Sequence, residues 1–125
     1  MTKEEIEAVD KDKEGLQTYE FLVNHLYELN DAQLSEVIDH LESADRSGQY
    51  LASGARYMHA IDSERFKEYV RRLVALTIER DRERNYLSDL IQALYGANYY
   101  DRVEELASDD NFRRMYKRLF PDGAL

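Results

Sequence analysis

The sequence predicts an all-α protein, arranged as a compact helical bundle or a short array of helical hairpins with six to eight helices. Apolar side chains recur at intervals of three and four residues, which is the spacing of one helical face. Only five glycines and one proline interrupt the chain, so one helix can follow another. Apolar residues make up 43% of the 125 residues, enough for a core in a single domain over 1–125.

The first helix is expected over residues 3–13. Thr2 and Glu5 match a capping box, in which each side chain accepts a free backbone amide from the other residue. Gly15 is placed to close this helix. Because its apolar residues are only Ile6 and Val9, residues 1–14 are expected to be a weakly packed, acidic N-terminal segment.

The next three helices follow from periodicity and caps. An apolar face predicts a helix over residues 16–29. Asn30 then begins a third helix, because Gln33 completes a second capping box. A fourth helix is expected over residues 49–60, where small side chains allow a close approach between helices.

The region 63–95 contains neither glycine nor proline and could form one helix. Residues 80–85 carry no apolar side chain, so the sequence favours two helices, or a bent one. Asp62 or Ser63 is the expected cap of the first, and Gly96 ends the second.

The last part of the chain predicts a short helix over 99–106 and a final helix over 110–119. Ser108 or Asp109 caps the final helix, and Pro121 terminates it. The expected buried set across the domain is Leu22, Leu26, Val37, Ile38, Leu41, Met58, Phe66, Val70, Leu73, Leu90, Ile91, Leu94, Leu106 and Leu119.

A degenerate internal repeat of about 35 residues is a further hypothesis. Residues 45–51 match residues 81–87 in an aspartate, an arginine and a Tyr-Leu pair, and residues 10–16 are a fainter copy. Each copy leads into an apolar helix, a turn and a second helix. The alternative is chance similarity between short helical patterns.

The net charge of −9 lies in one half of the chain. Residues 1–62 hold 14 acidic and 5 basic side chains, whereas residues 63–125 hold 12 of each. An acidic region attracts basic surfaces, so the expected partner is another protein with a basic surface. The N-terminal residues lack the apolar core of a signal peptide, and no apolar run could span a membrane. A cytoplasmic protein without a membrane partner is therefore expected.

The sequence shows no motif for catalysis, a metal or a cofactor. With no cysteine, there is no thiolate nucleophile or ligand. None of the three histidines completes a Glu-x-x-His pair, and the scattered glycines form no phosphate-binding loop. We therefore expect no enzyme activity and no cofactor, although an enzyme whose cleft is assembled without a local motif stays open as an alternative.

Three groups of residues are candidates for partner binding. Tyrosine is enriched, with ten in the chain, and Tyr95, Tyr99 and Tyr100 cluster around Gly96. The final helix carries four basic side chains on one face, which could bind phosphate or pair with the acidic half of the chain. The candidates are Tyr95, Tyr99, Tyr100, Glu36, Asp39, Arg113, Arg114, Lys117 and Arg118.

These features predict a non-enzymatic protein-interaction module. It would be a small regulator, adaptor or inhibitor of the kind that bacteria and mobile elements encode, and it could form homo-oligomers. A DNA-binding regulator that uses helix pairs and the basic segment Arg113–Arg118 is the alternative, although a net charge of −9 disfavours nucleic acid as a partner.

Overall fold

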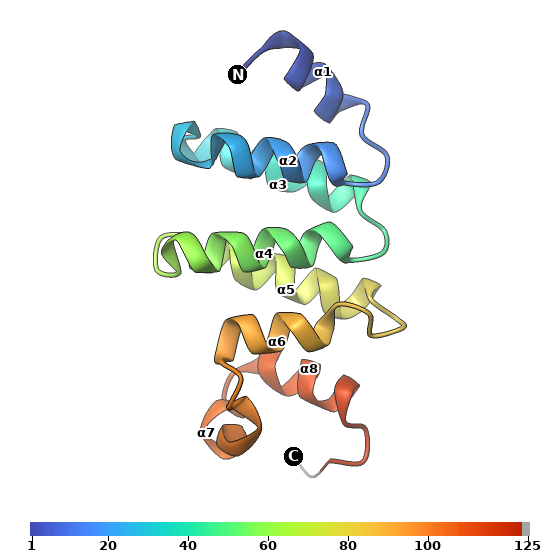
Figure 1. Ribbon diagram of the computed structural model, residues 1–125, viewed down its shortest axis with the longest axis vertical. Helices are drawn as coiled ribbons and strands as arrows, with labels where there is room; N and C mark the ends of the chain where they lie inside the picture. Colours follow the sequence, from blue (N-terminus) through green and yellow to red (C-terminus); the bar gives the residue numbers. More distant parts are fainter. Residues whose placement is uncertain (124–125) are drawn as a thin grey trace.

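Helices stack one after another along the long axis of the molecule in the computed structural model, which describes residues 1–123 (Figure 1). The α-helices are α1 (Lys3–Asp10), α2 (Leu16–His25), α3 (Asp31–Ala44), α4 (Gln49–Asp62), α5 (Lys67–Arg80), α6 (Leu87–Tyr95), α7 (Val103–Leu106) and α8 (Asp110–Leu119). Two 3-10 helices, η1 (Leu26–Glu28) and η2 (Tyr99–Arg102), complete the set. No strand occurs within residues 1–123, so the predicted all-α class is confirmed.

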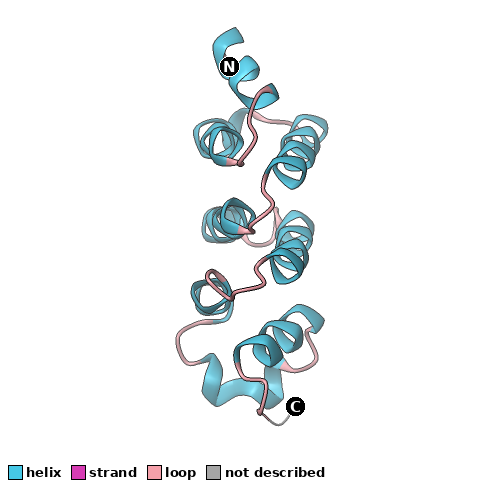
Figure 2. Cartoon of the chain, turned by 90° about the vertical axis from the view of Figure 1, so that its right-hand side faces the viewer, coloured by secondary structure: helices cyan, strands magenta, loops and turns pink. Residues whose placement is uncertain are grey.

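The helices form two columns, seen nearly end-on in Figure 2. Helices α2, α4 and α6 lie in one column, and α3, α5 and α8 lie in the other. α2 pairs with α3, and α4 pairs with α5. α6 packs against α8 in the same way, although η2 and α7 come between them in the sequence. α1 lies at one end of the stack, and α7 and α8 lie at the other (Figure 1).

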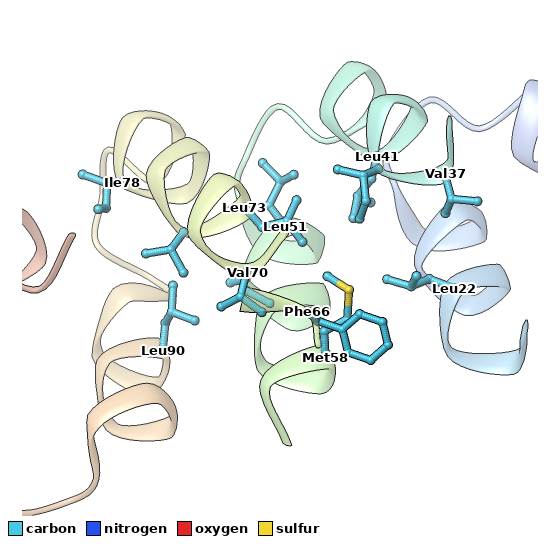
Figure 3. Packing of buried hydrophobic residues seen from close by; sticks show 14 of the residues in the cluster. Leu22, Val37, Leu41, Leu51, Met58, Phe66, Val70, Leu73, Ile78 and Leu90 are labelled. Atoms are coloured by element: carbon cyan, nitrogen blue, oxygen red, sulfur yellow. The ribbon is translucent and has the colours of Figure 1, made fainter. Parts of the chain in front are cut away.

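One apolar core runs through the stack and joins neighbouring hairpins (Figure 3). Leu22 of α2, Leu51 of α4 and Leu73 of α5 are fully buried in it. The predicted buried set is confirmed except for Leu94, Leu106 and Leu119, which are only partly buried. These three belong to α6, α7 and α8, the last helices of the stack.

The predicted short-range caps are confirmed at three helices. Thr2 and Glu5 form a capping box at α1, and Asn30 and Gln33 form one at α3. Asp109, one of two predicted candidates, accepts two amides at the start of α8. A cap that acts within three residues depends only on local sequence, which explains why these were predictable.

Two predicted boundaries around the first loop are wrong. α1 ends at Asp10 rather than at residue 13, and Gly15 begins α2 rather than closing α1. Gly15 adopts a φ of 104°, a left-handed conformation that a residue without a Cβ atom adopts at low cost. α2 ends at His25, and its last predicted turn is the tighter helix η1.

The region 63–95 forms two helices, as the sequence favoured, with the break over 81–86. The predicted cap at Asp62 or Ser63 is wrong, because α4 continues to Asp62 and α5 begins only at Lys67. Asp62 still accepts a hydrogen bond from the Arg65 amide, but within the turn between the two helices. Gly96 ends α6, as predicted.

An aspartate organises each loop that leads into a helix of the first column, and the aspartates before α4 and α6 are buried. Asp45 is 1% exposed, and its Oδ2 atom accepts the amides of Tyr50 and Leu51 at 2.8 and 2.9 Å. Asp81 is 2% exposed and accepts the amides of Tyr86 and Leu87 at 2.8 and 3.1 Å. These carboxylates satisfy amides at helix starts that lack intrahelical partners.

Asp12 has the same function before α2, where it accepts the Thr18 amide and hydroxyl, both at 2.8 Å. Burial alone would raise the pKa of Asp12, but these hydrogen bonds outweigh it and lower the pKa below the usual aspartate value. Asp12, rather than the predicted Asp10, therefore corresponds in its contacts to Asp45 and Asp81. The internal repeat as a property of the sequence stays a prediction.

Two arginines join successive members of the second column. Arg80, at the end of α5, donates to the carbonyls of Glu42 and Asp45 at the end of α3. Arg118, near the end of α8, donates to the carbonyls of Ile78 and Asp81 at the end of α5, at 2.5 and 2.9 Å. A guanidinium at a helix C-terminus satisfies free carbonyls and interacts favourably with the helix dipole.

Candidate partner-binding surfaces

A groove lies at the α1 end of the stack, between α1 and the pair α2–α3. Its volume is about 240 Å³, and most of its lining is apolar. Ile6 of α1 forms one wall and is 47% exposed, although it is a large aliphatic side chain. Phe21 of α2 and Val37 of α3 form the opposite wall and are largely covered. We refer to this feature as the N-terminal groove.

Acidic and polar side chains border the N-terminal groove. Asp10, Glu36 and His40 line its edge. α3 carries four acidic side chains and no lysine or arginine, and α1 carries four acidic side chains and one lysine. An apolar centre with a charged rim is the usual composition of a protein interface.

Two histidines connect α1 to the body of the protein. His25 Nε2 of α2 lies 2.5 Å from Glu5 Oε2, and His40 Nε2 of α3 lies 3.7 Å from Asp10 Oδ1. The hydrogen bond from His25, followed by that from the Thr2 amide, lowers the pKa of Glu5 to about 2. Val9 is the only buried residue of α1, so polar contacts contribute much of its attachment.

The two predicted acidic candidates differ in their surroundings. Asp39 Oδ1 accepts a hydrogen bond from Arg72 of α5 at 2.7 Å, so its charge is partly compensated within the chain. Glu36 is exposed at the groove and makes no ion pair or hydrogen bond within residues 1–123. Of the two, Glu36 is the one whose charge is available to a partner.

The three predicted tyrosines lie at the other end of the stack but do not form one surface. Tyr99 is buried against Phe112, and Tyr95 is half-buried. Tyr100 is 57% exposed, and its ring lies 5.2 Å from that of Phe120. Tyr100 therefore fits the predicted surface role, whereas Tyr99 belongs to the core.

The four basic residues of α8 also separate into two kinds. Arg113 donates to the Ala107 carbonyl at 2.8 Å and pairs with Asp110, and Arg118 caps α5 as described above. Arg114 and Lys117 make no ion pair or hydrogen bond within residues 1–123. The prediction that the basic residues of α8 pair with the acidic half of the chain is wrong, because within the described residues none of the four makes an ion pair or hydrogen bond with residues 1–62.

A second hollow of about 220 Å³ lies between α4, α5, α6 and the start of α8. Polar side chains predominate at its edge, and Lys67, Arg71 and Glu64 contribute charges of both signs. Tyr95 donates to Asp109 Oδ2 at 2.9 Å on its wall. Burial, and then this hydrogen bond, raise the pKa of Tyr95 well above its usual value.

The N-terminal groove was not predicted from the sequence. Its walls come from three helices, and Phe21 falls outside the apolar face assigned to residues 16–29. The only signal was Ile6, an aliphatic residue in a short acidic helix that has little else to bury. No group of three or more potential metal ligands occurs within residues 1–123, and none of the described helices has the length and apolar character of a membrane span.

No known protein family, curated protein or solved structure matches this chain. Its function must therefore be argued from the composition and geometry of its own surfaces.

Proposed function

We propose that this chain is a non-enzymatic protein-interaction module whose N-terminal groove binds a segment of another protein. The observation that carries the proposal is an apolar groove with an exposed Ile6 wall and an acidic rim. An exposed aliphatic side chain beside a preformed apolar recess gains free energy when a partner covers it.

The composition of the groove specifies the chemistry of the partner. A volume of about 240 Å³ is below the roughly 300–1,000 Å³ of a typical small-molecule site and suits one or two inserted side chains. The charges of Asp10 and Glu36 favour lysine or arginine beside those side chains. We therefore propose a partner segment with one or two large apolar residues flanked by basic ones.

Such a surface is suited to a small cytoplasmic regulator, adaptor or inhibitor, which acts by binding to another protein. The DNA-binding alternative has less support, because Arg113 and Arg118 already donate to backbone carbonyls of their own chain. For the enzyme alternative, the hollow beside Tyr95 is one site where a residue with a shifted pKa lines a recess. The raised pKa of that tyrosine keeps it protonated and makes it a weak acid or base at neutral pH.

Selection of a random peptide library against the immobilised protein tests the proposal. We expect enrichment of peptides that combine lysine or arginine with leucine, isoleucine or phenylalanine. Ile6→Ser removes the apolar wall, and Glu36→Lys reverses the rim charge; each should weaken binding of an enriched peptide roughly tenfold, or about 1.4 kcal/mol.

Glu79→Lys is the matched control, because it makes the same charge change at an exposed position of α5 away from the groove. Its peptide affinity should equal that of the wild type. If the library yields no such peptides, or if the control loses affinity as much as Glu36→Lys, the groove is not the binding site.

A further inference from the structure

His25 of α2 lies between two carboxylates at the α1 end of the stack. Its Nε2 atom lies 2.5 Å from Glu5 Oε2 of α1, and its Nδ1 atom lies 3.2 Å from Glu28 Oε2 of η1. The side chain of His25 is 12% exposed, and the ring of Phe21 packs against it with 4.7 Å between the ring centroids. Both ring nitrogens therefore face acidic partners in a largely covered position.

This arrangement determines the protonation state of the ring. A carboxylate only accepts hydrogen bonds, and a neutral imidazole has a single N–H group to donate. Both contacts can be hydrogen bonds at the same time only if the ring is a doubly protonated imidazolium. The hydrogen bond from His25 is the main cause that lowers the pKa of Glu5 to about 2, so Glu5 is ionised at neutral pH and does not supply the proton. The ring that holds α1 in this structure is thus the charged one.

The surroundings of His25 contain no third partner for the ring. Within residues 1–123, no other side chain forms an ion pair or a hydrogen bond with it. α3 and α4 also pack against α2, and neither contributes such a group. The charge on the ring is therefore balanced by one carboxylate from α1 and one from η1.

His40 of α3 makes the second histidine contact with α1, and this contact is weaker. Its Nε2 atom lies 3.7 Å from Asp10 Oδ1, and the two side chains are 47% and 61% exposed. The two recesses that this pair borders contain charged side chains of both signs: Asp12, Lys13, Glu36 and Arg46. Because solvent and salt screen an exposed pair, His25 contributes more to the attachment of α1 than His40 does.

Little else holds α1 in place. Val9 is its only buried residue, and Ile6 remains 47% exposed in the wall of the N-terminal groove. The loop that follows α1 is anchored separately, because Asp12 accepts hydrogen bonds from Gly15 and Thr18. Loss of the contact with His25 would therefore release residues 1–11 and leave the start of α2 in place.

We propose that the charge on His25 controls the N-terminal groove by holding α1 against α2. While the ring is an imidazolium, α1 stays docked and Ile6 completes the wall of the groove; when the ring loses its proton, α1 leaves and the groove loses that wall. The inference rests on the proposed function, because it names the regulation of the same groove. Histidine is the side chain whose ordinary charge change falls between about pH 5 and 8, so the control would act near physiological pH.

The two charged partners limit the pH range of docking from opposite sides. A contact that needs the charged ring is fully present at low pH and is lost as the pH rises and the ring deprotonates. The contact also needs the carboxylate of Glu5, and its lowered pKa of about 2 keeps that group ionised in mild acid. We therefore expect α1 to be docked under mildly acidic conditions and released under mildly alkaline ones.

Nuclear magnetic resonance from about pH 5.5 to 9 tests the inference on the wild-type protein. The ring protons of His25 report its charge, and the backbone amides of Ala8 and Val9 report the docking of α1. Both sets of signals should titrate with the same midpoint, and the docking equilibrium should fall roughly tenfold, because a hydrogen bond to a charged group is lost. The Thr18 amide should not change, since its Asp12 partner is not part of this contact. Amides of α1 that do not change over this range overturn the inference.

Substitution of His25 removes the charge that titrates. In His25→Gln, α1 should be released over the whole range, and its amides should no longer follow the pH. His59→Gln is the matched control, because His59 lies on α4 and makes no ion pair or hydrogen bond within residues 1–123. Release that still follows the pH in His25→Gln, or that stops following it in His59→Gln, overturns the inference.

A variant of the second carboxylate keeps the inference testable if His25→Gln does not fold. Glu28 is 59% exposed, so Glu28→Gln leaves the core intact and removes one of the two charges that favour the imidazolium. The midpoint of α1 release should therefore move to lower pH. Glu79→Gln makes the same change at an exposed position of α5 and should leave the midpoint where it is in the wild type. An unchanged midpoint in Glu28→Gln overturns the inference.

Peptide affinity over the same pH range separates this inference from the proposed function. A selected peptide without histidine should lose affinity about tenfold, with the same midpoint as the release of α1. If peptides bind with an affinity that does not depend on pH, the proposed function stands and the control by His25 is wrong. If α1 is released as expected but no peptide binds at any pH, the control of α1 by His25 is supported and the proposed function is wrong.

Discussion

Replacement of Asp45 by alanine should destabilise the protein more than any single surface change. The Asp45 carboxylate is 1% exposed and accepts five hydrogen bonds, two of them from buried amides, those of Gly48 and Leu51. A buried donor left without an acceptor costs about 1–3 kcal/mol, whereas amides nearer the surface can bind water. The two buried amides therefore predict a loss of about 3–4 kcal/mol in the free energy of unfolding.

The asparagine variant refines this estimate. Asp45→Asn keeps one acceptor oxygen but turns the other into a donor, so the amides bound by one of the two oxygens lose their acceptor. Its expected cost is about half that of alanine, close to 2 kcal/mol. Asp62→Ala is the matched control, since Asp62 accepts one exposed hydrogen bond, and it should cost less than about 1 kcal/mol.

Urea denaturation followed by circular dichroism measures all three variants. The midpoint should shift without a change in slope, because the surface exposed on unfolding stays the same. In thermal melts, a loss of 3–4 kcal/mol corresponds to about 10–15 °C for a domain of this size. If Asp45→Ala and Asp62→Ala lie within about 1 kcal/mol of each other, the loop carboxylate does not organise the start of α4 and the reasoning is wrong.

Three further predictions concern the core and α1. Val70→Asp should unfold the domain at 25 °C, because Val70 is 7% exposed and an unpaired buried charge costs several kcal/mol; loss of the helical circular dichroism signal would show this, and Val70→Ala should remain folded. Deletion of residues 1–10 removes α1 but keeps Asp12, so the melting temperature should fall less than for Asp45→Ala, while peptide binding to the N-terminal groove is lost. The pKa of Glu5 is lowered to about 2, so its hydrogen bond with His25 stabilises the protein above the ordinary glutamate pKa of about 4.3 and is lost as the pH falls toward 2. The difference in melting temperature between wild type and Glu5→Gln should therefore shrink over that range, and a constant difference would contradict the pairing.

Local signals in the sequence predicted most of the helices and their short-range caps. Periodic apolar residues predicted both the existence and the order of the helices, and the polar stretch 80–85 predicted the break between α5 and α6. The boundary at Asp62 was wrong for a physical reason. Asp62 does bind an amide three residues on, but the turn that follows does not continue into a helix until Lys67.

The aspartates that cap α4 and α6 from the preceding loops were only partly predictable from the sequence. The similarity of residues 45–51 and 81–87 suggests a repeat in the sequence, and it also has a structural cause. The aspartate at the start of each segment must reach the amides of the Tyr-Leu pair at its end. Cap predictions that look three residues ahead miss a contact over five or six residues, although the same residue types would have indicated it.

The binding surfaces were the least predictable part of the structure, because the sequence does not show whether a charged side chain binds another part of the chain or remains exposed to solvent. Arg118 and Lys117 are neighbours in a basic helix, yet Arg118 caps the end of α5 and Lys117 remains exposed. The difference arises from the direction in which each side chain leaves α8 relative to the preceding hairpin. Tertiary packing therefore decides which charges stabilise the stack.

The position of a charge in the stack separates its two roles. Charges in the loops and at the helix ends between hairpins, such as Asp45, Asp81 and Arg80, bind backbone groups of adjacent elements. At the two ends of the stack no further hairpin within residues 1–123 supplies such groups, so Glu36 and Lys117 stay in solvent. In a stacked helical protein, the end surfaces are thus where unpaired charge and uncovered apolar side chains coincide. Ile6, at the α1 end, is such an uncovered apolar side chain, and it forms the wall of the groove that we propose as the binding site.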